Sequence, residues 1–166
     1  CLDFNFQGLF EITDEGLKNF CSEGIKNLTQ LASLSLNFGK CMEIGILTGG
    51  TLREDEVVSI YKANNWSSAQ KPQTLLAALS NSHTLLTARS NNQLLGLANA
   101  ISDGHLVVYF PHLIVHPDYQ GMGIGRKLMT AMLQRYADFH QIMLTADIGA
   151  LSFYVTLGFV KAGKTV

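Results

Sequence analysis

The chain has 166 residues, 47% hydrophobic and 15% charged, and its 12 Lys and Arg against 13 Asp and Glu give a formal net charge of -1. This composition predicts a folded chain of about one domain and excludes a highly charged, apolar-poor disordered sequence. The near-neutral charge argues against a broad nucleic-acid-binding face and a polybasic membrane surface, and no apolar run approaches the roughly 18 residues of a membrane-spanning helix.

The three cysteines, Cys1, Cys21 and Cys41, all lie in the first quarter of the chain. Their spacing fits no zinc-site pattern, so we expect no resident metal. An odd number of cysteines without a disulfide framework is typical of a reducing compartment. The chain also starts without a charged region followed by an apolar stretch, which a secretory signal requires. These features predict a cytoplasmic location.

Residues 1–41 differ in pattern from the rest of the chain. Four leucines between residues 28 and 36 lie in the run LTQLASLSLNFGKC, and a partial echo of the pattern lies upstream. This spacing resembles one leucine-rich repeat and the start of the next. Because one repeat cannot bury its own apolar face, we expect this segment to pack on the rest of the chain, to pack on a partner or to be poorly ordered. A gene-fusion remnant is a further alternative.

Residues 42–166 are predicted to form a second, compact unit in which helices and strands are mixed. Its first half contains a strand at 42–47, a helix opened by a capping box of Thr51 and Glu54, a polar loop at 64–72, a helix that begins near Pro72, and strands at 83–89 and 93–101 joined by a turn at 90–92.

The second half begins with an apolar run from His105 to Val115 that Pro111 interrupts. Because proline cannot donate to the hydrogen-bond ladder of a sheet, we expect a bulge or a strand break at Pro111. The pattern then predicts a helix over 124–138, a strand at 141–146, a short helix from Ala150 to Leu157 that ends at Gly158, and a last strand from Phe159.

The most informative segment is the loop Gln120-Gly121-Met122-Gly123-Ile124-Gly125-Arg126, between a predicted strand and a predicted helix. Its glycines permit positive φ and a close approach of the backbone to a ligand. The first amides of the helix have no intrahelical acceptor, so they suit a phosphate or pyrophosphate, and Arg126 can add a charged contact. The loop matches neither the dinucleotide fingerprint nor the nucleotide P-loop, and a plain tight turn is the alternative.

Two motifs together resemble the GNAT superfamily of N-acetyltransferases. The first is its acetyl-CoA-binding pattern, LIVHPDYQGMGIG at residues 113–125, and the second is A-x-x-F-Y-x-x-L-G-F at residues 150–159. They occur in the family's order, and the resemblance covers residues 42–166. It implies an α/β (α+β) fold with a mixed, mostly antiparallel sheet flanked by helices. In that fold one parallel pair of strands splays apart, here near Pro111.

The resemblance also implies an enzyme that moves an acetyl group from acetyl-CoA to a primary amine, by direct attack in a ternary complex. Backbone groups of Leu113, Ile114 and Val115 would bind the pantetheine arm and the thioester carbonyl, and the amides from Gly121 to Arg126 would bind the pyrophosphate. The second motif and its surroundings add three cofactor-binding candidates, which are Asp147 (where the family usually has Asn), Ala150 and Phe153.

The resemblance assigns Tyr154 as the general acid that protonates the departing thiolate, with a core aromatic as the alternative. His112 is the first candidate for the general base, because it lies at the predicted strand break and imidazole titrates near neutral pH. A structural role for His112 and a proton relay through water are the alternatives. We expect His116 in a connecting loop, and His83 and His105 at solvated strand ends.

Trp66, in the polar loop, is the candidate for binding the acceptor, and ordinary packing is its alternative. Nothing selects among acceptors, which range from small amines to protein N-termini or lysines. A non-catalytic CoA-binding sensor or a protein-interaction module is the competing function. The family continues with a final hairpin after the second motif. Here the last strand is therefore absent, supplied by a neighbouring chain or replaced by the N-terminal segment, and an open sheet edge would favour a homodimer.

Overall fold

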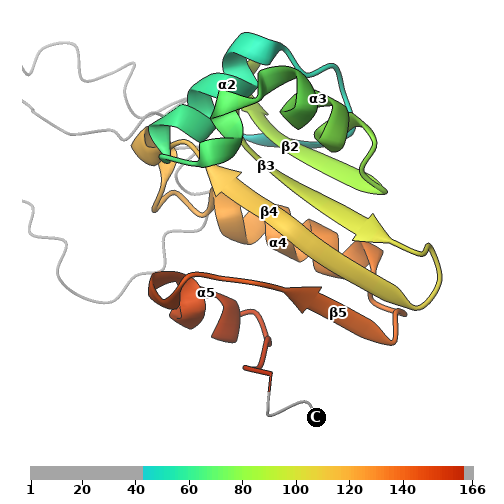
Figure 1. Ribbon diagram of the computed structural model, residues 1–166. Helices are drawn as coiled ribbons and strands as arrows, with labels where there is room; N and C mark the ends of the chain where they lie inside the picture. The colour runs from blue at the N-terminus through green and yellow to red at the C-terminus, as the bar shows by residue number, and fades with distance from the viewer. Residues whose placement is uncertain (1–42, 163–166) are drawn as a thin grey trace, which may run out of the picture. The chain divides into compact units, whose positions relative to one another are not determined.

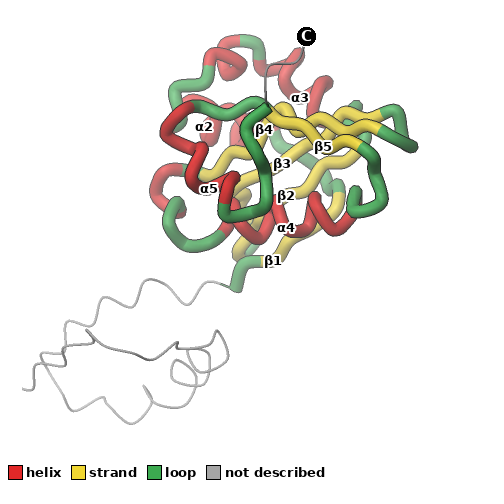
Figure 2. The backbone as a smooth tube through the Cα atoms, turned by 90° about the horizontal axis from the view of Figure 1, so that it is seen from below, coloured by secondary structure: helices red, strands yellow, loops and turns green. Residues whose placement is uncertain are grey.

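The computed structural model describes residues 43–162, and the leucine-rich-repeat-like segment lies outside them. The described residues form one five-stranded sheet in the order β1-β2-β3-β4-β5 (Figure 1). Helices α2 and α3 cover one face of this sheet and α4 covers the other, as the turned view also shows (Figure 2). The elements are β1 (Gly45–Thr48), α2 (Glu54–Ala63), η2 (Ser67–Gln70), α3 (Pro72–Ser80), β2 (Thr84–Ser90), β3 (Gln93–Ser102), β4 (Val107–Val115), η3 (Pro117–Tyr119), α4 (Ile124–Arg135), β5 (Gln141–Leu144), η4 (Ile148–Ala150) and α5 (Leu151–Val155).

The pairing of the strands confirms the fold expected from the sequence. The pairs β1–β2, β2–β3 and β3–β4 are antiparallel, and only β4 and β5 are parallel. The turn predicted at 90–92 is present, with φ of +47° at Asn91 and +65° at Asn92. Two successive residues with positive φ match the twist of a tight hairpin, and asparagine adopts this conformation more readily than most residues.

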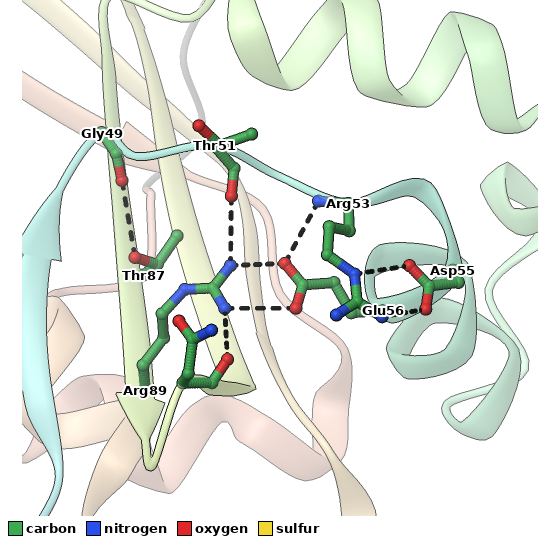
Figure 3. A network of polar contacts seen from close by, with 8 residues as sticks. Gly49, Thr51, Arg53, Asp55, Glu56, Thr87 and Arg89 are labelled. Atoms are coloured by element: carbon green, nitrogen blue, oxygen red, sulfur yellow. Dashed lines mark hydrogen bonds and ion pairs between the residues drawn. The ribbon is translucent and has the colours of Figure 1, made fainter.

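The start of α2 differs from the sequence prediction. The N-cap is Arg53, and its amide donates to the Glu56 carboxylate at 3.2 Å, so the capping interaction begins two residues after Thr51. A tertiary contact accounts for this later start of the helix. Arg89 of β2 forms a bidentate pair with Glu56 and also donates to the Thr51 carbonyl at 3.3 Å (Figure 3). This pair fixes Glu56 at the third helical position, and Glu54 becomes the first residue of the helix.

Apolar side chains fill both faces of the sheet. On the face of α2 and α3, a cluster of buried residues includes Val57, Ile60, Leu79 and Leu97. On the opposite face, α4 contributes Ile124, Leu128, Met129 and Met132, all of them buried. The sheet is therefore held from both sides. The helix periodicity at 124–138 correctly predicted α4, although the helix ends at Arg135.

The end of the described chain also differs from the prediction. Gly158 has φ of +92° and ends the last helix, as expected. Residues 159–162, however, form no strand. Instead the Phe159 amide donates to the Tyr154 carbonyl at 3.1 Å, which turns the chain back over α5.

Pro111 produces a bulge and not a strand break. Between the cross-strand pairs Asn99–His112 and Ile101–Tyr109, β3 has one residue and β4 has two, Phe110 and Pro111. Strand β4 continues through the bulge to Val115, whereas its pairing with β5 covers only Val107 to Phe110. The two parallel strands therefore part at Pro111.

Candidate active site

A cleft of about 330 Å³ opens where β4 and β5 part. Its walls come from four distant parts of the sequence, and the residues that line it are Trp66, Phe110, Pro111, Leu113, Thr145, Ala146, Asp147, Ala150 and Tyr154. Five of these were singled out from the sequence as candidate site residues. The fold thus brings the Trp66 loop, β4, the segment after β5 and α5 to one place.

The register of β4 decides which of its backbone groups face the cleft side. The His116 amide donates to the Leu95 carbonyl at 2.8 Å, so these residues form a hydrogen-bonded pair of the antiparallel ladder. Such pairs alternate along a ladder. Ile114 therefore directs its backbone groups toward β3, whereas Leu113 and Val115 direct theirs toward the side that β5 has left. Of the three residues predicted to offer backbone groups, Ile114 is the least suited.

The end of β4 is tied to α2 and to the glycine loop by side-chain amides. The Val115 carbonyl accepts hydrogen bonds from Asn64 Nδ2 and Gln120 Nε2, both at 3.1 Å, and Gln120 Nε2 also lies 3.1 Å from Asn64 Oδ1. Gln120 thus holds the start of the loop in place. At Val115 the amide is the backbone group that these bonds leave free.

The glycine loop presents a row of free amides. Gly121 and Gly123 have φ of +78° and +76°, and Gly123 is the N-cap of α4. Within residues 43–162, no oxygen accepts a hydrogen bond from any amide between Gly121 and Arg126. Successive free amides at the N-terminus of a helix form a binding site for an anion.

Arg126 and Thr156 connect the first turn of α4 to the end of α5. Arg126 Nη2 donates to Thr156 Oγ1 at 2.8 Å, and Thr156 Oγ1 donates to the Phe153 carbonyl at 2.7 Å. A Cβ atom on Gly125 would lie 3.6 Å from the ring of Phe153. Phe153 therefore packs against the glycine loop through its apolar ring.

Tyr154 lies half-buried in the cleft wall. Its ring packs edge-on against Phe153 and Phe159, with centroid distances of 5.0 Å and 5.8 Å. Burial raises the pKa of the Tyr154 phenol above its ordinary value, and the negative charge of Asp147 raises it further. The phenol is therefore protonated at neutral pH and can donate a proton.

His112 lies one side chain behind the cleft. Its Nδ1 is 2.8 Å from the Tyr61 hydroxyl, and its ring packs edge-on against Trp66 at a centroid distance of 5.4 Å. Trp66 lines the cleft and His112 does not. Burial lowers the pKa of the His112 imidazole below its ordinary value, so the ring is neutral at pH 7.

The other histidines lie away from the cleft walls. His116 caps η3 in the connection after β4, where its Nδ1 accepts from the Asp118 amide at 3.3 Å, in agreement with the predicted loop position. His83 and His105 are exposed, as expected for strand ends. His83 differs from the expectation in one respect, because its Nδ1 lies 2.7 Å from the Tyr136 hydroxyl.

Sequence reasoning missed Tyr61, Asn64 and Thr156. No role was assigned to Tyr61 from the sequence, although a buried tyrosine hydroxyl needs a hydrogen-bond partner. No local pattern marks Asn64 or Thr156. Each acts on a residue more than 25 positions away, at distances that only the fold sets.

Comparisons with known proteins agree with this geometry. The sequence model of the acetyltransferase (GNAT) domain matches residues 50–166. The chloroplastic GCN5-related N-acetyltransferase 2 of Arabidopsis thaliana is 30% identical over 154 residues, which cover 78% of this chain and 58% of that protein. A GNAT-family acetyltransferase from Streptococcus pneumoniae has a TM-score of 0.63 at 29% identity, covering 71% of this chain and 88% of that one.

A more distant structure extends the likeness of fold. It is an aminoglycoside N-acetyltransferase in complex with CoA, with a TM-score of 0.57 at 14% identity over 75% of this chain and 93% of that one. The chain spans between 38% and 58% of the length of the first four curated proteins that it matches. Within residues 43–162, no helix has the length and apolarity needed to cross a membrane.

Proposed function

Because this chain belongs to the GNAT family of acetyltransferases, we propose that residues 42–166 transfer an acetyl group from acetyl-CoA to a primary amine. The observation that carries the proposal is the row of free amides from Gly121 to Arg126. The row adjoins the cleft where β4 and β5 part, because a Cβ on Gly125 would lie 4.0 Å from the side chain of Leu113, which lines that cleft. An anion-binding loop and an open strand edge are the two features needed to hold a diphosphate joined to an extended amide-containing arm.

The residues suit this cosubstrate. The loop amides and Arg126 would hold the pyrophosphate, and the backbone groups of Leu113 with the Val115 amide would hold the pantetheine arm. Asp147 and Ala150 would contact the arm from the opposite wall. We assign supporting roles to Gln120, which fixes the loop, and to Phe153, which packs against it. We do not include Ile114 among the residues that bind the pantetheine arm, because its backbone groups face β3.

When bound, acetyl-CoA supplies an acetyl group activated as a thioester. The amine nitrogen forms a bond to the acyl carbon and the carbon–sulfur bond breaks, so one proton must leave the nitrogen and one must reach the sulfur. The Leu113 amide donates to the acyl oxygen as negative charge develops there. Tyr154 donates its phenolic proton to the sulfur.

We assign His112 as the base that receives the proton from the amine. Because Trp66 and not His112 lines the cleft, the proton passes through a water molecule beside Trp66. The neutral imidazole that burial favours is the form able to accept it. Trp66 forms the aromatic wall against which the acceptor packs.

The test has two parts, binding and transfer. Isothermal titration of the full chain with acetyl-CoA is expected to show one site, and desulfo-CoA is expected to bind through the same loop. A panel of amines, from small polyamines to peptides with free N-termini or lysines, is then screened for release of the CoA thiol. Failure to bind would contradict the cosubstrate. Binding without thiol release from any amine would contradict the transfer and favour a CoA sensor.

The cellular compartment of the protein requires a separate experiment. A reducing compartment keeps the free thiol of CoA reduced, and the cysteine pattern predicts the cytoplasm. The Arabidopsis relative is named as chloroplastic, and the chloroplast is the second location to test. Imaging of the tagged full-length protein separates the two.

A further inference from the structure

Two buried tyrosines of this chain each form a hydrogen bond with the Nδ1 atom of a different histidine. The Tyr61 hydroxyl lies 2.8 Å from His112 Nδ1, and the Tyr136 hydroxyl lies 2.7 Å from His83 Nδ1. Tyr61 and Tyr136 are both almost completely inaccessible to solvent. Tyr61 belongs to α2 and Tyr136 caps α4, so the pairs lie on opposite faces of the sheet. In the first pair the histidine itself packs against Trp66, which lines the cleft. In the second pair only the tyrosine contacts a cleft residue, with 5.8 Å between the ring centroids of Tyr136 and Phe110.

The surroundings of His112 make this contact the main polar influence on its ring. Tyr61 and Trp66 pack edge-on against the imidazole, at centroid distances of 5.6 Å and 5.4 Å. The cross-strand partner from β3 is Asn99, a neutral side chain. Within residues 43–162, burial is the cause that shifts the pKa of His112, and no charged group contributes. Tyr61 is the titratable group that faces His112, and burial keeps its phenol protonated.

A histidine that accepts a proton at one ring nitrogen must carry its first proton on the other. With Nδ1 held by Tyr61, Nε2 is the nitrogen left to exchange a proton with the cleft. For Nε2 to have a free lone pair, Nδ1 must carry the hydrogen and donate it to the phenolic oxygen. The same donation persists after Nε2 is protonated, so the hydrogen bond serves both states of the base.

We propose that Tyr61 is a positioning residue for His112: its buried hydroxyl accepts the Nδ1 hydrogen and thereby keeps Nε2 available to receive the proton of the acceptor amine. This inference rests on the proposed function, in which His112 is the base. Tyr61 touches neither the acceptor nor acetyl-CoA and acts only through the imidazole.

The second pair supplies a control for mutation, with one difference: the Tyr136 hydroxyl also donates to Thr84 Oγ1 at 2.6 Å. Tyr61→Phe and Tyr136→Phe each remove one hydroxyl from a buried tyrosine bonded to a histidine Nδ1, and each keeps the packed ring. We expect Tyr61→Phe to lower kcat about 10-fold, less than the roughly 10² to 10⁴ of a whole acid–base contribution because His112 itself remains, with the KM for acetyl-CoA unchanged. The acidic limb of its pH profile moves to lower pH, because the imidazolium loses an acceptor. Tyr136→Phe is expected to leave kcat and the pH profile unchanged.

A measurement on the unmodified protein tests the inference without any activity. The ¹⁵N chemical shifts of His112, recorded above its pKa without ligand, are expected to show a protonated Nδ1 and an unprotonated Nε2. In Tyr61→Phe the proton is expected to move toward Nε2. A wild-type ring protonated at Nε2 would overturn the inference, as would a Tyr61→Phe variant with the wild-type pH profile.

The two proposals fail in different ways. A wild-type chain that acetylates no amine would overturn the proposed function, while the nitrogen shifts would still decide which partner donates in the Tyr61–His112 bond. If Tyr61→Phe does not fold, the wild-type shifts alone decide the inference.

Discussion

At the scale of single residues, the electrostatics of the cleft determine which groups can donate or accept a proton at neutral pH. Burial acts in opposite directions on the two catalytic candidates. It raises the pKa of Tyr154 and lowers that of His112, because in each case it disfavours the charged form. The phenol therefore keeps its proton and the imidazole stays neutral, which is the arrangement that an acid–base pair requires.

Asp147 is expected to adjust the pKa of the Tyr154 phenol. Its negative charge adds to the effect of burial on the phenol, so Asp147→Asn should lower the pKa of Tyr154. Because Tyr154 acts in its protonated form, the basic limb of the pH profile for kcat should move to lower pH in Asp147→Asn. Tyr154→Phe should remove that limb and reduce kcat by about 10² to 10⁴.

Asp138→Asn is a suitable control, because it removes the same charge from an exposed position beyond α4 that does not line the cleft. The measurement is the rate of CoA thiol release against pH. An unchanged basic limb in Asp147→Asn, or full activity in Tyr154→Phe, would contradict the assignment of Tyr154 as the acid.

At the scale of elements, one ion pair joins three segments. Arg89 of β2 binds the Glu56 carboxylate of α2, the Thr51 carbonyl of the β1–α2 connection and the Asn92 carbonyl of the β2–β3 turn (Figure 3). The side chains of both charged residues are 13–14% exposed. Because the bonds between Arg89 and Glu56 are partly buried, the pair is expected to contribute more than a surface ion pair.

Glu56→Gln is expected to lower the free energy of unfolding by about 2 kcal/mol at pH 7, the scale of a hydrogen bond to a charged group. Burial alone would raise the pKa of Glu56, but the hydrogen bonds from Arg89 and from the Arg53 amide outweigh it, and the net shift is downward. A carboxyl with a lowered folded-state pKa stabilises the fold above its unfolded pKa, and this stability disappears as pH falls through the folded pKa.

The difference between Glu56→Gln and wild type, measured by urea denaturation, should therefore shrink as pH falls below the ordinary range of a glutamate. Asp55→Asn breaks a pair with Arg53 whose side chains are both 67% exposed, and it should change stability much less than Glu56→Gln does. Equal losses in the two variants would show that shielding from water does not distinguish the pairs.

Gly96 of β3 allows a close approach between β3 and β4, the strand that lines the cleft. A Cβ atom there would lie 2.7 Å from the Ile114 carbonyl oxygen, closer than real Cβ contacts allow, and 3.1 Å from a Val115 side-chain carbon, which is tighter than most. Gly96→Ala should displace the end of β4, cost about 1–3 kcal/mol of stability and weaken acetyl-CoA binding. Gly45→Ala in β1 is the control, because a Cβ there meets nothing within 4 Å. Calorimetric titration of both variants checks the expectation, and unaltered binding in Gly96→Ala would contradict it.

The elements that the sequence predicted well are those with local causes. Pro111 cannot complete the ladder, and it lies in the bulge of β4. The turn at Asn91 and Asn92 and the helix end at Gly158 likewise depend on residues that tolerate positive φ. The start of α2 was predicted wrongly because a distant residue intervenes. Arg89 fixes the start of α2, and no pattern near Thr51 contains that information.

The candidate site likewise has features that the local sequence predicts and features that depend on the fold. Its glycine loop and second motif are continuous in sequence and were recognisable from it. The contacts made by Tyr61, Asn64 and Thr156 depend on which elements become neighbours, so only the fold could reveal them. The role of each predicted site residue stays a prediction until the variants are measured.

At the scale of the whole molecule, several exposed apolar side chains belong to the part of the chain from β5 onward. Ile148, Val155 and Val160 are among the exposed large hydrophobic residues there. Within residues 43–162, no strand pairs with the outer edge of β5. An open edge can pair with another chain. The homodimer expected from the sequence stays a prediction.

The glycine loop links ligand binding to the stability of the whole molecule. A ligand that binds only the folded state at 100 times its Kd adds about 2.7 kcal/mol to the free energy of unfolding. Acetyl-CoA should therefore raise the Tm of the wild-type chain. Gly123→Ala should lose most of this increase, because φ of +76° strains any residue with a Cβ and the loop amides must rearrange to relieve it.

Gly104→Ala separates loss of binding from loss of stability. Gly104 has φ of +83° in the β3–β4 turn, outside the cleft lining, so both variants should lose about 1–2 kcal/mol of stability without ligand. With acetyl-CoA, the Tm of Gly104→Ala should rise as much as that of wild type, because its loop amides are intact. If acetyl-CoA raised the Tm of Gly123→Ala as much as that of wild type, the cosubstrate would be held elsewhere. If the ligand-induced rise in Tm were reduced equally in Gly123→Ala and Gly104→Ala, the glycine loop would affect binding only through the stability of the fold.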